Sequence, residues 1–158
     1  MTLPFERNIK CSNYVGETID MAVDMGVKVI LFVAHIGKFV KVAAGIMNTH
    51  SHSADARMEV LAANALRVGA DGDTARGILN CNTTDEALDI LHEKGLLEPA
   101  MQEIMERIQF YLDHRSYEQI KLGAVVFNNV YGYLGKTRDA GELIQEIQKQ
   151  DEMLKLQM

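Results

Sequence analysis

Tryptophan is absent from this chain of 158 residues, which holds only two prolines and two cysteines. Two cysteines, Cys11 and Cys81, are too few for the disulfide framework of a small secreted domain, so we expect reduced thiols in the cytoplasm. Residues 1–12 lack the apolar segment of a secretory signal. The longest uninterrupted apolar run, 29–34, is far shorter than the roughly 20 residues that cross a bilayer. These absences predict a soluble cytoplasmic protein without a membrane partner.

An excess of basic residues is also lacking, because the formal net charge is −6. A nucleic-acid protein would need a basic face to neutralise phosphates, so we expect no nucleic-acid partner. The glycine-rich nucleotide motifs GxGxxG and the P-loop are absent, as is the nucleophile elbow GxSxG. Between residues 35 and 52, however, the only formally charged side chains are Lys38 and Lys41. A local positive segment in an acidic chain favours a small anionic ligand over a polymer.

Apolar residues make up 47% of the chain, enough for the core of one domain, 1–158. Residues 27–34 are rich in β-branched side chains and apolar on both faces, which is typical of a central strand. Residues 15–25 have helical spacing and Gly26 follows as a C-cap. With a strand end at 8–12, this predicts a βαβ unit. The ends of parallel strands carry ligand sites, and 12–13 and 35–38 would meet there.

The rest of the chain is mostly helical in pattern, with one more apolar run at 121–128 and a glycine-containing partner strand at 130–136. Helices are expected at 39–47, 54–68, 71–80, 84–94, 99–114 and 140–156. The fold class is therefore α/β, a small mostly parallel sheet flanked by helices, Rossmann-like and helix-rich. So few strands for so many helices indicate a partial protein, or a sheet that a partner completes.

Residues 35–59 hold the densest group of titratable and polar side chains. His35 and His50 can exchange protons near neutral pH. Lys38, Lys41 and Arg57 can bind carboxylates. The alternative for Asp55, Arg57 and Glu59, a solvated helix face with weak ion pairs, stays open.

Other chemistries have weaker signals. His50 and His52, with His35, Asp55 and Cys11, could ligate a metal, but such HxH pairs are common and we favour no protein-bound metal. Cys11 could be a reactive thiol before a helix, although a small buried thiol is favoured. Asn128 and Asn129 are expected to form a turn after their strand.

Three motifs carry a resemblance to a known family. They are GE..D.A...G at 16–26, HIGK at 35–38, and GI.NTHS.SAD.RME at 45–59, with a weaker FNN at 127–129. Together they resemble the C-terminal part of the CbiD family, the cobalt-precorrin-5B C(1)-methyltransferases of anaerobic cobalamin biosynthesis. The resemblance covers nearly the whole chain.

The resemblance implies S-adenosylmethionine as the methyl donor and a tetrapyrrole substrate that brings its own cobalt, methylated at ring carbon 1. Family members are about twice as long, and the N-terminal half has no counterpart here. A separate N-terminal chain or a homo-oligomer is then an expected partner, and the activity of this chain by itself is in question. The alternatives are a non-catalytic tetrapyrrole-binding or assembly domain and, more remotely, a metal hydrolase.

The resemblance also suggests roles for individual residues. His35 and His50 are the candidate catalytic residues, as general bases. Substrate carboxylates and the macrocycle edge would meet Lys38, Lys41, Asn48, Thr49, Ser51, Asp55 and Arg57, over a floor of small residues at 43–45 with Met47. The methyl donor would meet Ser12, Asn13, Gly16, Glu17 and Gly37.

Overall fold

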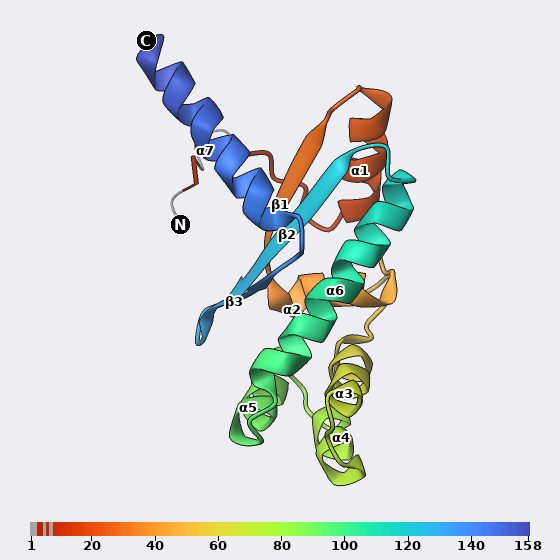
Figure 1. Ribbon diagram of the computed structural model, residues 1–158. Helices are drawn as coiled ribbons and strands as arrows, with labels where there is room; N and C mark the ends of the chain where they lie inside the picture. Colours follow the sequence, from red (N-terminus) through yellow and green to blue (C-terminus); the bar gives the residue numbers. More distant parts are fainter. Residues whose placement is uncertain (1–2, 5, 7) are drawn as a thin grey trace.

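A small sheet lies between two long helices in the computed structural model, which describes residues 3–4, 6 and 8–158 (Figure 1). The strands are β1 (Val29–His35), β2 (Lys121–Asn128) and β3 (Gly132–Lys136), and the long helices are α6 (Leu97–Ser116) and α7 (Ala140–Leu156). The shorter helices of the described chain are α1 (Val15–Asp24), α2 (Ile36–Phe39), the 3-10 helix η2 (Val40–Ala44), α3 (Arg57–Arg67), α4 (Gly72–Leu79) and α5 (Thr84–Glu93). The α/β class is confirmed.

The sheet has the order β1-β2-β3 and is mixed. β1 pairs with β2 in parallel, with Val29 opposite Lys121 and His35 opposite Phe127. β2 pairs with β3 in antiparallel orientation, through a short turn that begins at Asn128. The expectation of a mostly parallel sheet is therefore not met, because only one of the two strand pairs is parallel, and a Rossmann-like arrangement is not confirmed.

The predicted βαβ unit over residues 8–34 is wrong. Residues 8–11 are irregular, and Ser12 adopts a left-handed backbone with φ 51° in a turn before α1. The parallel partner of β1 is instead β2, which comes after five α-helices and the 3-10 helix η2. A five-residue polar segment has too few apolar side chains to hold a place in a sheet, whereas β2 is buried along most of its length.

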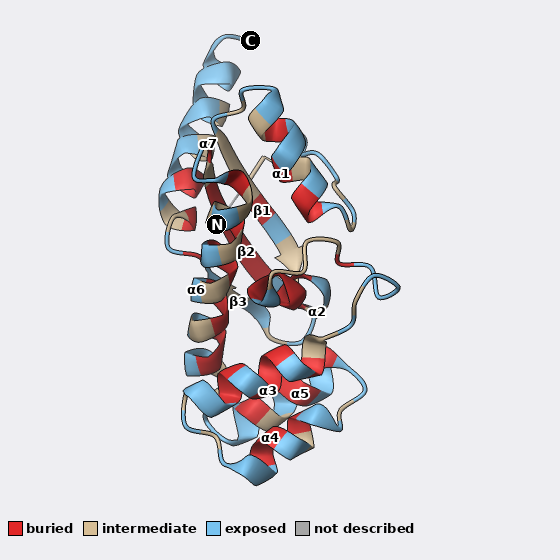
Figure 2. Ribbon diagram, turned by 90° about the vertical axis from the view of Figure 1, so that its right-hand side faces the viewer, coloured by how far each residue is buried: buried red, intermediate tan, exposed pale blue. Residues whose placement is uncertain are grey.

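The two faces of the sheet bury different helices. Leu122, Ala124 and Val126 point into the main core, on the side of α6. Val125 points to the opposite face and packs with Ala140 and Ile144 of α7. Figure 2 shows the buried residues along β2 and α6, and the mostly exposed distal part of α7. This alternation is the period-two pattern of a covered sheet.

Helices α3, α4 and α5 gather at the end of the molecule to which β1 runs, beside the first half of α6 (Figure 1). Their starts follow the sequence signals. Asp71 caps α4 by accepting from the amide of Thr74, and Thr83 and Glu86 form a capping box on α5. Most predicted helix positions are confirmed within a few residues. The helix expected at 39–47 begins earlier, at Ile36, and ends at Ala44 as a 3-10 helix.

No helix among the described residues is both long enough and apolar enough to cross a membrane.

Candidate functional site

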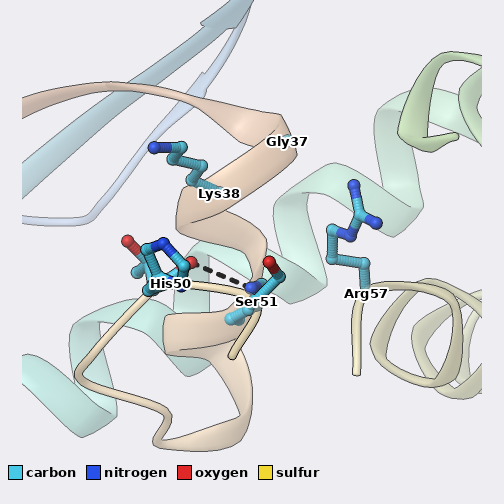
Figure 3. A pocket seen from close by; sticks show the side chains of 7 residues that line it. Gly37, Lys38, His50, Ser51 and Arg57 are labelled. Atoms are coloured by element: carbon cyan, nitrogen blue, oxygen red, sulfur yellow. Dashed lines mark hydrogen bonds between the residues drawn. The ribbon is translucent and has the colours of Figure 1, made fainter. Parts of the chain in front are cut away.

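A pocket of about 240 Å³ lies beyond the carboxyl end of β1 (Figure 3). Its lining comes from three segments that follow one another in the chain: the α2–η2 helix pair, the irregular segment 45–56, and the start of α3. The lining residues are Gly37, Lys38, Lys41, Thr49, His50, Ser51 and Arg57. All seven belong to the polar segment 35–59 that the sequence singled out.

Helix α2 begins at the pocket because His35 caps it. The imidazole Nδ1 of His35 accepts a hydrogen bond from the amide of Gly37 at 3.1 Å. A side chain at position 37 would bring a Cβ to 3.0 Å from that same Nδ1, so any larger residue would press on the imidazole. His35 also packs edge-on against Phe127 of β2, with ring centroids 5.7 Å apart. The cap fixes the orientation of the imidazole, which does not itself line the pocket.

Lys41 is buried in the wall of the pocket, with 2% of its surface exposed. Its ammonium donates to the carbonyl oxygens of Thr49 and Ala54, each at 2.9 Å. Burial lowers the pKa of the Lys41 ammonium, because desolvation penalises its charged form. No ion pair among the described residues involves this ammonium.

The segment between the two Lys41 acceptors is a compact turn around His50. Asn48 Oδ1 accepts from the amide of His50 at 3.1 Å, and the carbonyl of His50 accepts from the amide of Ser53 at 3.0 Å. The imidazole Nδ1 of His50 accepts from the amide of His52 at 3.1 Å, and the two rings stack. We call residues 48–54 the His50 turn.

Arg57 is already paired inside the chain. Its guanidinium donates to both carboxylate oxygens of Asp55, at 2.8 and 3.1 Å. The hydrogen bonds to Arg57 lower the pKa of the Asp55 carboxyl, and the same contact raises the pKa of Arg57. The ion-pair alternative for these two residues is thus confirmed, although Arg57 still faces the pocket.

Lys38 lies at the mouth of the pocket and is exposed (Figure 3). Its ammonium donates to Oδ1 of Asn13 at 3.1 Å. The amide of Thr49 donates to the carbonyl of Asn13 at 3.0 Å, and Tyr14 and Asn48 form an isolated antiparallel bridge. Residues 13 and 38 therefore meet as expected, but through the Lys38–Asn13 hydrogen bond and not through adjacent strand ends.

Known proteins similar to this chain identify the family to which it belongs. Residues 48–138, more than half of the chain, match the family described as CbiD, C-terminal domain. The chain belongs to the CbiD family. Both the resemblance of its motifs and the assignment to the C-terminal part are confirmed.

Curated relatives carry the name cobalt-precorrin-5B C(1)-methyltransferase. The protein of Ruminiclostridium cellulolyticum is 39% identical over 155 residues, which cover 95% of this chain and 40% of the relative. That of Alkaliphilus metalliredigens is 38% identical, covering 87% and 36%. That of Methanocaldococcus jannaschii is 40% identical, covering 76% and 33%. The chain thus spans about two-fifths or less of these CbiD relatives, and no solved structure matches it.

Two of the residues expected to bind the methyl donor in this CbiD chain are used in packing. The amide of Gly16 donates to the carbonyl of Met47 at 3.1 Å, and a Cβ there would lie 2.8 Å from Met47 Cβ. The amide of Gly37 is taken by His35. The pocket, at about 240 Å³, is also smaller than the roughly 300–1,000 Å³ typical of small-molecule sites. Of the five residues expected to meet the methyl donor, only Gly37 lines this pocket.

The small residues at 43–45 serve contacts within the CbiD chain. Gly45 has φ 78° and faces the ring of Tyr111, where a Cβ would lie 2.8 Å from a ring carbon. The carbonyl of Ala43 accepts from Nε of Arg107 at 3.3 Å. Helix α6 therefore packs against these small residues.

Sequence reasoning missed the α6 residues that support the site. Arg107 reaches Ala43 across 64 positions, and Arg115 reaches Asp20 across 95. No local spacing rule could have found pairs so far apart in the chain. Asn128, by contrast, is in the expected turn, where its side chain donates to Asp85 and accepts from the amide of Tyr131.

The other residues considered as metal ligands or nucleophiles do not form a cluster in the described part of this CbiD chain. No group of three histidine, cysteine or acidic side chains in the described part of the chain could hold a metal ion. Cys11 and Cys81 are both free thiols, and burial raises the pKa of Cys81. Ser12 and Glu17 are exposed near α1, outside the pocket lining.

Proposed function

We propose that this chain binds a carboxylate arm of a cobalt-precorrin and holds it for methylation at ring carbon 1, as part of an S-adenosylmethionine-dependent methyltransferase. The observation that carries the proposal is the charge of the pocket. Lys38 and Lys41 are both held by neutral oxygen atoms, and Arg57 is neutralised by Asp55. The exposed ammonium of Lys38 is thus left without a carboxylate partner, with the buried charge of Lys41 behind it, and a carboxylate ligand would supply that partner.

The volume of the pocket limits which part of the substrate it can bind. A volume of about 240 Å³ accommodates an acetate or propionate arm, but it is too small for a tetrapyrrole macrocycle. The macrocycle would lie outside, against the exposed parts of the His50 turn. Ser51 and the exposed ammonium of Lys38 are the side chains there that can donate to further carboxylates.

The two candidate catalytic histidines are better placed to donate a hydrogen bond than to act as general bases. Both His35 and His50 use Nδ1 to accept a backbone amide hydrogen, so the neutral ring carries its proton on Nε2. A general base would need a free ring nitrogen pointing at the substrate. We propose that His50 Nε2–H donates a hydrogen bond to the substrate, and that His35 acts through the α2 cap.

The methyl donor requires more than this chain supplies. Methyl transfer depends mainly on placing the donor and acceptor carbons in line. Since the amides of Gly16 and Gly37 are used within the chain, we propose that the donor site is completed by the portion of CbiD relatives that has no counterpart here. Asn13 and Glu17 are then the residues of this chain closest to that role.

The alternative function, a non-catalytic tetrapyrrole-binding or assembly domain, is favoured by the same observation. A chain with a carboxylate pocket but no donor site would bind the substrate without turning it over. The two functions share the pocket and differ in whether methyl transfer appears when the N-terminal portion of a relative is added.

Calorimetric titration with dicyanocobyrinic acid, a corrin with free carboxylates, tests the proposal. We expect binding that weakens with added salt and that is lost for the fully methyl-esterified corrin. Lys38→Met should weaken binding, whereas Lys94→Met, a change on the remote helix α5 end, should not. Absence of binding, or equal binding of acid and ester, would contradict the proposal.

A further inference from the structure

The His50 turn is closed at its neck by one side chain. Lys41 donates to the carbonyl of Thr49 at the start of the turn and to that of Ala54 at its end. Within the turn, the other hydrogen bonds join residues two to four positions apart. The start of the turn also contacts residues 13–14, because the amide of Thr49 donates to the carbonyl of Asn13 and Asn48 bridges Tyr14. Lys41 bonds to both ends of the turn and so ties each of them to η2.

A buried ammonium is costly unless its protons are bonded. Lys41 is almost fully buried, and both of its acceptors are backbone carbonyls. The carboxylate of Asp55, which is hydrogen-bonded to Arg57, acts on Lys41 through its charge and is not one of these acceptors. Hydrogen bonds from a charged donor are stronger than neutral ones, and more so where water is excluded. The charge therefore strengthens the two bonds that close the turn, and a neutral side chain of the same length could not make them.

We infer that Lys41 is a positioning residue: its ammonium locks the His50 turn so that His50 and Ser51 keep their places on the pocket. In this role Lys41 does not meet the substrate carboxylate, in contrast to its expected role as a substrate-binding residue. The consequence for ligand binding rests on the proposed function, whereas the locking of the turn does not.

The sharpest variant is Lys41→Met, which keeps an unbranched stem and removes the ammonium. Amide hydrogen exchange of Ser53 and Ala54, which both donate to the carbonyl of His50, reports on the turn without any ligand. We expect exchange at these amides to accelerate about ten-fold or more, as loss of one or two charge-assisted bonds predicts. The matched control Lys38→Met removes a lysine that bonds Asn13 at the pocket mouth and should leave these amides unchanged.

Rescue separates the charge from the bulk of the side chain. Lys41→Ala opens the space of the whole side chain, and n-propylammonium ions should restore slow exchange at Ser53 and Ala54. Propanol has a similar size but no charge and should not restore it. Lys41→Arg, which keeps a charged donor, should retain most of the protection and carries the test if Lys41→Met fails to fold.

Two results would overturn the inference. Unchanged exchange in a folded Lys41→Met, or lost protection in a folded Lys41→Arg, would show that the turn does not depend on the ammonium. Weaker corrin binding by Lys41→Met with unchanged exchange would show instead that Lys41 meets the ligand directly. If wild-type chain binds no corrin at all, the proposed function fails, while the exchange result still decides the role of Lys41.

Discussion

Arg115 holds Asp20 through two hydrogen bonds, of 2.8 and 2.6 Å, and so joins the end of α6 to α1. The pairing lowers the pKa of the Asp20 carboxyl. The guanidinium also lies beside Gly16, so α1 can lie close to both Arg115 and Met47 only because residue 16 has no side chain. This contact places the first helix against the segment that leads into the His50 turn.

Arg115→Met should lower the free energy of unfolding at neutral pH by roughly 0.5–1 kcal/mol, since both partners are partly exposed. Because the folded-state pKa of Asp20 lies below its usual 3.8, the contribution is present above that pH and is lost as the pH falls further. Urea unfolding of both chains between neutral and acid pH measures this. A stability difference that persists undiminished in acid would mean that packing, not the ion pair, is responsible.

Gly16→Ala should destabilise the fold by about 1–3 kcal/mol, because its Cβ would lie 2.8 Å from Met47 Cβ and 2.9 Å from Arg115 Cζ. Gly77→Ala is the matched control, since it is also helical and its Cβ would meet only Ile90 Cδ1 at 3.7 Å. The control should be neutral or up to about 1 kcal/mol stabilising. Thermal unfolding compares the two, and equal effects would refute the packing explanation.

Asp55→Asn should tighten the binding of dicyanocobyrinic acid about three- to ten-fold. The change removes the carboxylate that occupies Arg57 and leaves one more positive charge facing the pocket. Asp73→Asn frees Arg76 on the exposed face of α4 and is the control for a change of net charge. Calorimetric affinities measured side by side would argue against an anion pocket if both variants gained equally.

Tyr131 should titrate late, because its hydroxyl donates to the carboxylate of Asp89, which raises the pKa of Tyr131 to about 12. The folded-state pKa exceeds the unfolded value of 10.0, so this contact stabilises the fold below pH 10 and its contribution is lost between about pH 10 and about 12.

The ultraviolet absorbance of tyrosinate follows this titration. Tyr131→Phe should abolish the late step, and Asp89→Asn should shift it to lower pH, whereas Tyr14→Phe should leave it in place. A late step that survives in Tyr131→Phe would assign it to another tyrosine.

Local patterns of the sequence were sufficient for most helices and for the strands at 27–34 and 121–128. Caps such as Thr83 with Glu86, and glycines such as Gly26, act over a few residues and can be recognised from spacing. The strand expected at 8–12 was wrong because strand pairing is non-local. A short polar segment carries no information about which partner is available to it.

The features of the site also separate into those that follow from the sequence and those that follow from the fold. The sequence by itself determined the residue types of the segment 35–59, its local positive charge and its family. Only the tertiary structure decided that Lys41 is buried against two carbonyls, that Arg57 is paired, and that α6 supports the small residues at 43–45. The physical reason is that a side chain's partner depends on which backbone and neighbours the fold brings within about 3 Å, and these come from residues far apart in the chain.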